Sequence, residues 1–99
     1  MTDKRVTVVA RIRAKEGQEE KVKETLLSLV QLTCAEPGCI NYHLHQAVED
    51  KGLFMFYENW TNRKALDEHM AMPYLKAFMG KAVDILAGPV DITFWEMLA

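Results

Sequence analysis

The pattern of apolar and polar positions changes its period several times along the chain. A two-residue period, typical of β-strands, predicts strands at residues 6–13, 39–48, 53–60 and 90–97. One face of the first predicted strand is apolar throughout and carries Val6, Val8, Ala10 and Ile12. The polar run Glu49-Asp50-Lys51-Gly52 predicts a hairpin between the second and third strands.

Between these strands the apolar residues recur at helical spacing, which predicts helices. The first covers about residues 18–33 and ends where Glu36-Pro37-Gly38 turns the chain. Its apolar stripe consists of Val22, Leu26, Leu29, Val30 and Thr33, widened by Leu27 and Leu32. The second helix begins after Thr61 or Asn62, either of which is a suitable N-cap, and runs to about Met72. Pro73 fits the first turn of a third helix, which ends before Gly88-Pro89.

The resulting order of elements is βαββαβ. Right-handed crossovers and a hairpin in this order predict a ferredoxin-like, two-layer α+β sandwich, with four antiparallel strands and the helices on one side. All of residues 1–99 fit in this one domain, since single domains usually have about 100–150 residues. Such an arrangement leaves one face of the sheet without a helical cover.

The third predicted strand is apolar on both of its faces. Phe54 and Phe56 point one way, whereas Leu53, Met55 and Tyr57 point the other. Exposing the second set would cost roughly 1.5–3 kcal/mol for each large side chain relative to burial. A second subunit on the open sheet face would remove this cost, so the pattern predicts a homodimer.

Composition and charge narrow the range of partners. The chain has 99 residues, 49% of them apolar, and a net charge of −2, so we expect no basic face for nucleic acid. Its apolar runs are far shorter than the roughly 20 residues of a membrane-spanning helix, and its start has no long apolar segment of a signal peptide. We therefore expect a cytoplasmic protein that does not enter membranes.

The two cysteines and three histidines do not have the spacing of a metal site. Cys34 and Cys39 flank the Glu36-Pro37-Gly38 turn, and cytosolic chains usually keep such thiols reduced. The pattern favours two mostly buried free thiols over a disulfide, and it predicts no bound metal.

Several short motifs, in order and at matching intervals, resemble the antibiotic biosynthesis monooxygenase family. They are Lys15-Glu16-Gly17, Glu36-Pro37-Gly38-Cys39, Tyr57-Glu58-x-Trp60, Ala65-Leu66-x-x-His69 and Pro73-Tyr74. The resemblance spans nearly the whole chain and implies a dimeric α+β barrel, similar to the quinol monooxygenases. It also implies oxidation of a small quinol or phenolic substrate with O2 and without a cofactor.

Other branches of this family act on a phosphorylated signalling metabolite or degrade haem. The haem-degrading branch needs an axial histidine on the long helix and an asparagine on the first strand. Residues 77–81 contain no histidine and residues 6–13 contain no asparagine, so haem is not expected here.

Two histidines are candidates for the base that would deprotonate a phenol. An imidazole has a pKa near 6.5, which suits this task at neutral pH. His69 is either this base or a buried structural residue. His43 is the alternative base if its face of residues 39–48 points inward, and the sequence leaves that face open.

The remaining candidates would bind the substrate. Trp60 is either a flat wall for an aromatic ring or a core residue. Glu58 is either the partner of a basic side chain, which the pattern favours, or an acid with a raised pKa. The other candidates for the lining are Phe56, Tyr42, Phe78 and Met79.

Two other functions stay open on the sequence alone. An isomerase or degradation enzyme for a small phosphorylated metabolite would need a basic side chain in the cavity, whereas Arg11, Arg13, Lys64 and Lys76 read as surface charges. A non-catalytic binding dimer would have a sealed pocket and a His69 bonded to the backbone.

Overall fold

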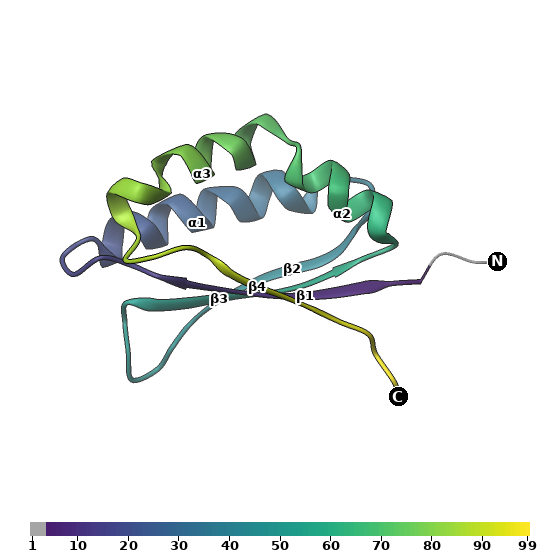
Figure 1. The fold of residues 1–99 in the computed structure, drawn as a ribbon, viewed down its shortest axis with the longest axis horizontal. Coiled ribbons are helices and arrows are strands. Elements are labelled where there is room, and N and C mark those ends of the chain that lie inside the picture. Colours follow the sequence, from purple (N-terminus) through teal and green to yellow (C-terminus); the bar gives the residue numbers. More distant parts are fainter. Residues whose placement is uncertain (1–3) are drawn as a thin grey trace.

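Alternating apolar residues place one face of each central strand against the helices in the computed structural model, which describes residues 4–99 (Figure 1). The elements in chain order are β1 (Val6–Arg13), α1 (Glu19–Cys34), β2 (Cys39–Gln46), β3 (Leu53–Trp60), α2 (Arg63–Met70), α3 (Pro73–Ile85) and β4 (Asp91–Trp95). This order confirms the predicted βαββαβ arrangement.

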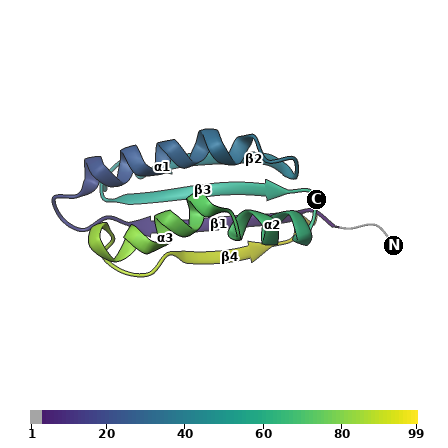
Figure 2. The same ribbon diagram turned by 90° about the horizontal axis from the view of Figure 1, so that it is seen from above.

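The four strands form one antiparallel sheet in the order β2-β3-β1-β4. Figure 2 shows α1 above the β2 side of the sheet and α3 above the β4 side. The helices all lie on one face, and no element among residues 4–99 covers the other (Figure 1). The fold is therefore the predicted ferredoxin-like α+β sandwich with an open sheet face.

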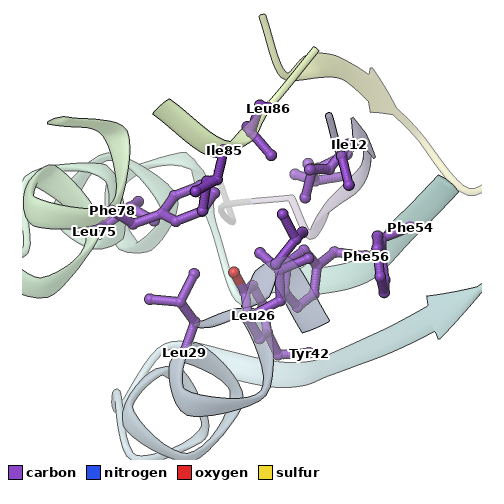
Figure 3. Packing of buried hydrophobic residues seen from close by; sticks show 14 of the residues in the cluster. Ile12, Leu26, Leu29, Tyr42, Phe54, Phe56, Leu75, Phe78, Ile85 and Leu86 are labelled. Carbon is purple, nitrogen blue, oxygen red and sulfur yellow. The ribbon is translucent and has the colours of Figure 1, made fainter. Parts of the chain in front are cut away.

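The core fills the space between the two layers (Figure 3). On β3, Phe54 and Phe56 point into it and are 1% and 2% exposed, whereas Tyr57 on the open face is 41% exposed. The apolar face of β1 is buried from Val8 to Ile12. The two-residue period thus separates the two faces as predicted.

Some predicted boundaries and burials are wrong. Residues 47–48 do not continue β2, and β4 is confined to Asp91–Trp95 instead of residues 90–97. Leu27 and Leu32 do not widen the buried stripe of α1, because they are 50% and 48% exposed. Leu27 comes directly after the buried Leu26, and Leu32 directly before the buried Thr33. Successive residues of an α-helix are turned by about 100°, so both leucine side chains point away from the buried stripe.

The turn between α1 and β2 is held close to α2. A Cβ atom on Gly38 would lie 2.3 Å from the Cβ of Ala65, so only glycine permits this approach. Asn62 caps α2 by accepting a hydrogen bond from the backbone N–H of Ala65 at 2.8 Å. Together these contacts bring the turn at Glu36 beside the buried face of α2.

Both cysteines at the ends of this turn are free thiols. Cys39 is half-buried, but Cys34 is exposed, so the prediction of two mostly buried thiols is wrong for Cys34. It is the last residue of α1 and lies on the solvent side of the helix end. No helix among residues 4–99 has the length and apolar character needed to cross a membrane.

Candidate active site

A cavity of about 180 Å³ lies between the sheet and the helices α2 and α3. Its walls are apolar and include Val8, Ile12, Phe56, Leu75, Phe78 and Ile92. In Figure 3 the side chains of Phe78 and Leu75 on α3 approach this space from the helical layer. A small apolar cavity with a few polar groups is typical of a site for a small molecule.

His69 is the first of these polar groups. It lies one turn after Leu66 on α2, so both residues point toward the sheet, and it is only 2% exposed. Its Nδ1 is 2.8 Å from Oε2 of Glu36. The same carboxyl oxygen accepts a hydrogen bond from the hydroxyl of Tyr74.

Glu36 determines which nitrogen of His69 is free. Because the Tyr74 hydroxyl donates to Oε2 of Glu36, this oxygen is an acceptor, and we assign the proton of its contact with His69 to Nδ1. In the neutral imidazole the lone pair is then on Nε2. Nε2 has no hydrogen-bond partner within residues 4–99, and His69 lines the cavity. This nitrogen can therefore accept a proton from a bound molecule.

Two aromatic rings hold the imidazole in place. The ring of Trp60, which is fully buried, lies 4.6 Å from the ring of His69 between centroids, at a tilt of 33°. Tyr42 meets the same imidazole edge-on at 5.5 Å. These contacts fix the orientation of Nε2, because the imidazole cannot rotate without displacing a buried ring.

Glu58 is the second polar group of the cavity, and it is 4% exposed. Its Oε1 accepts a hydrogen bond from Nε1 of Trp60 at 2.9 Å. Burial raises the pKa of Glu58 to about 7, and the charge of Glu36 adds to this rise, although the bond from Trp60 opposes it. The favoured pairing with a basic side chain does not occur within residues 4–99, and the acid with a raised pKa is the alternative that the structure matches.

Tyr42 supplies a hydroxyl group on the same side of the sheet. Burial raises the pKa of this phenol well above its ordinary value, and the charge of Glu58 adds to the effect. Figure 3 shows that the hydroxyl points from β2 into the space between the sheet and the helices. At neutral pH Tyr42 keeps its proton and can donate a hydrogen bond.

The structure brings most of the predicted site residues to one cavity. Those that line it are His69, Glu58, Phe56, Tyr42, Phe78 and Met79. Trp60 does not line the cavity but lies behind His69. His43 is exposed on the open face, where it pairs with Tyr57 on β3, so the condition for its role as a base is not met within this chain.

The register of β2 explains this placement. Tyr42 lies opposite Glu58 and His43 lies opposite Tyr57, so the inner face of β2 is the one with Tyr42. The pairing also shifts between Cys39 and Asn41, which indicates a bulge at the start of the strand. Alternation alone could not identify this face, because both faces of β2 carry ring-bearing side chains.

Glu36 and Tyr74 are functional candidates that sequence reasoning missed as site residues. Glu36 is 33 residues from its partner His69, and no local pattern links two positions so far apart. Burial and the bond to Glu36 raise the pKa of Tyr74 to about 12, so its hydroxyl stays a donor. The run Glu36-Pro37-Gly38 marks a turn in the sequence, but nothing in it shows that the carboxyl of Glu36 is buried.

Sequence reasoning also missed the residues at the rim of the cavity. Arg63 places its guanidinium 4.8 Å from the ring centre of Phe94, and its Nε is 3.1 Å from Oδ1 of Asp67. All three residues line the cavity and are exposed. Within residues 4–99, no three His, Cys, Asp or Glu side chains cluster in a way that could hold a metal ion.

Comparisons with known proteins agree with this architecture. The sequence model of the family described as "Antibiotic biosynthesis monooxygenase" matches residues 5–81. A relative named "Putative monooxygenase Rv0793", from Mycobacterium tuberculosis, is 30% identical over 88 residues, which make up 89% of this chain and 86% of the relative. The crystal structure of PA3566 from Pseudomonas aeruginosa is similar with a TM-score of 0.93 and 31% identity, covering 100% of this chain and 99% of that one.

A third relative is longer than this chain. The uncharacterized protein sll1783 from Synechocystis is 32% identical over 95 residues, which make up 96% of this chain. The match covers only 65% of that relative, so this chain spans about two thirds of its length.

Proposed function

Because the chain belongs to the antibiotic biosynthesis monooxygenase family, we propose that it oxidises a small quinol or other phenolic aromatic with O2 in the cavity beside His69, without a cofactor. One observation carries the proposal. A buried histidine faces an apolar cavity, and a carboxylate 2.8 Å away holds its other nitrogen. This arrangement positions a base where a flat, apolar ring would bind.

The proposed reaction begins with transfer of the phenolic proton to Nε2 of His69. The resulting anion is rich in electrons and reduces O2, while the apolar walls exclude water from the ring. One oxygen atom of O2 then stays on a ring carbon and the other leaves as water. The substrate gains one oxygen and loses two hydrogens, so a quinol plus O2 gives a hydroxyquinone plus water.

The charges around the cavity support an aromatic substrate over a phosphorylated one. Arg63 is the one cation among the residues that line the cavity within the described chain, and it is already paired with Asp67. A phosphate group would need an unpaired cation or several N–H donors. His69 also bonds to a carboxylate instead of the backbone, which is not the arrangement expected for a sealed, non-catalytic pocket.

We further propose that a second copy of the chain covers the open sheet face. Met55, Tyr57 and Leu53 all lie on this face, and they are exposed or only half-buried. Val9 and Arg11 on β1 line a shallow hollow beside Leu53 and Met55. A homodimer would bury this apolar surface without covering the helical layer above the cavity.

The test of the proposed reaction is O2 consumption with a quinol, using protein stripped of metal ions and a protein-free control for spontaneous oxidation. We expect His69→Ala to lower kcat by about 10²–10⁴-fold, since this is the usual contribution of a general base. His69→Gln serves as a second variant that keeps a polar side chain beside Glu36. His43→Ala should retain activity, because this imidazole lies on the opposite face.

Thermal unfolding of each variant would show that the fold is intact. Equal rates for the wild type and the protein-free control would contradict the proposed reaction. A His69→Ala variant that is folded and fully active would remove His69 from it.

A further inference from the structure

We infer that Glu58 is a second catalytic residue, which donates the proton that lets one oxygen atom of O2 leave as water. This inference rests on the proposed oxygenation, and it assigns to Glu58 a step that His69 alone does not explain. Cleavage of a hydroperoxide on the ring needs an acid at the departing oxygen and a base at the ring C–H.

The position of Glu58 is that of a reacting group. Its side chain is almost fully buried, yet it lines the cavity. Oε1 is held by the indole N–H of Trp60, whereas Oε2 accepts no hydrogen bond from residues 4–99 and is not enclosed by them. Glu36 differs, because it does not line the cavity and its Oε2 is held by both His69 and Tyr74. Glu58 therefore has one anchored oxygen and one that is free to meet a bound molecule.

The same indole positions both reacting groups. Trp60 donates to Glu58 through its N–H and packs its ring 4.6 Å from the ring of His69. A movement of this one side chain would displace the acid and the base together. The burial of Trp60 thus gives the two groups a fixed relation across the cavity.

The surroundings of Glu58 favour its neutral form. Val8 of β1 and Tyr42 of β2 are its cross-strand neighbours. The titratable groups that face it from the packed elements are Tyr42 and Cys39 of β2, Glu36 of the preceding turn and His69 of α2, while α3 contributes the apolar Leu75 and Phe78. Arg63 and Asp67 of α2 are paired with each other at the rim. Burial without a cationic partner raises the pKa of Glu58 to about 7, so the acid is available at neutral pH.

The proton inventory of the step balances. His69 takes the phenolic proton and returns it to the peroxide anion that forms on the ring carbon. The Glu58 carboxyl then donates its proton to the outer oxygen as the O–O bond breaks, and water leaves. In the same step the electron pair of the ring C–H becomes the new C=O bond and displaces the O–O pair, and the released ring proton passes to the Glu58 carboxylate. Both groups end in their starting protonation states.

The test compares Glu58→Gln with the wild type in the same quinol assay. The glutamine can still accept the bond from Trp60 but cannot donate a carboxyl proton. We expect kcat to fall by about 10²-fold or more with KM changed by only a few-fold. In the wild type, kcat should decline as the pH rises through about 7, and this decline should be absent in Glu58→Gln.

A product measurement separates a chemical role from a structural one. Without the acid, the two-electron reaction that gives a quinone and hydrogen peroxide should compete, so more hydrogen peroxide per O2 consumed is expected from Glu58→Gln. Glu68→Gln, a change at an exposed position of α2 outside the cavity, is the matched control. It should behave as the wild type.

Failure of the role of Glu58 and failure of the oxygenation itself would give different results. An active wild type with an equally active Glu58→Gln, the same pH profile and the same peroxide yield would overturn the role of Glu58 and leave the oxygenation standing. A wild type that oxidises no quinol above the protein-free rate would overturn the oxygenation, and the role of Glu58 with it.

Discussion

The two faces of the sheet are built from the same strands, but their polar side chains differ in how fully they are hydrogen-bonded. On the open face, Thr7 donates to Asn59 at 2.6 Å, Asn59 donates to Asn41 at 2.9 Å, and Asn41 donates to the backbone of Tyr57 at 3.1 Å. Each polar side chain in this row bonds to its neighbour. The row resembles a structural network, because it leaves little hydrogen-bonding capacity for a ligand.

On the inner face, the polar side chains are buried and make fewer hydrogen bonds to one another. Glu58 and His69 are each held at one atom and keep another atom free beside an apolar cavity. This contrast supports the proposals that the reaction takes place on the inner face and that a second copy of the chain covers the open face.

The largest expected difference between the faces is in packing. Phe56→Ala should lower the free energy of unfolding by about 3–5 kcal/mol, because this ring is buried and lies 4.4 Å from the ring of Tyr42. Tyr57→Ala, one residue further, should cost much less in dilute protein. Urea denaturation of both variants measures the difference, and equal losses would contradict the division into an inner core and an open face.

The second expected difference is a decrease in the free energy of unfolding with rising pH, caused by the buried Glu58. Its pKa is about 7 in the folded protein against 4.5 for the ordinary group, so the folded state binds more protons between these values. The free energy of unfolding should therefore fall as the pH rises from 4.5 to 7, by up to about 3.5 kcal/mol at about 1.4 kcal/mol per pKa unit. Glu58→Gln should not show this decrease, because glutamine does not titrate. The stability of the variant relative to the wild type should therefore increase with pH. Parallel curves from urea titrations at several pH values would show that Glu58 is not buried as a neutral acid.

The open face should respond to charge through assembly. Met55→Glu would place a carboxylate on the face that the second copy is proposed to cover, and we expect the dimer to dissociate about 10–100-fold more readily. Light scattering over a range of concentrations measures this change. A wild type that remains a single species of 11.3 kDa at micromolar concentration would rule out the dimer.

The smallest expected effect is in the polar row of the open face. Thr7→Val removes the donor to Asn59 and should cost about 1 kcal/mol of stability, since one hydrogen bond is lost. The rate of quinol oxidation should not change, because neither residue lines the cavity. A large loss of activity at unchanged stability would mean that the open face takes part in the chemistry.

The fold could be predicted well from local patterns, because its helices and strands depend on interactions between residues that are close in the sequence. The apolar face of β1, the cap at Asn62 and the helix start at Pro73 each depend on a few neighbouring residues. His69 was placed on the sheet side of α2 by its spacing from Leu66. Such features need no knowledge of distant parts of the chain.

The candidate site was less predictable because its key relations are long-range. The pairing of Glu36 with His69 joins two segments that are separate until the chain folds. The inner face of β2 depends on its register against β3, not on its own pattern. The raised pKa of Glu58 depends on burial without a cation, which a single sequence does not reveal.

A crystal structure with a bound phenol that does not react with O2 would test the central claim most directly. The division between the faces predicts the ring in the apolar cavity, with its hydroxyl in hydrogen-bond contact with Nε2 of His69 and with Oε2 of Glu58 near the ring edge. His43 should not contact the phenol. A phenol bound to the open face, or a cavity that stays closed to it at saturating concentration, would contradict the account.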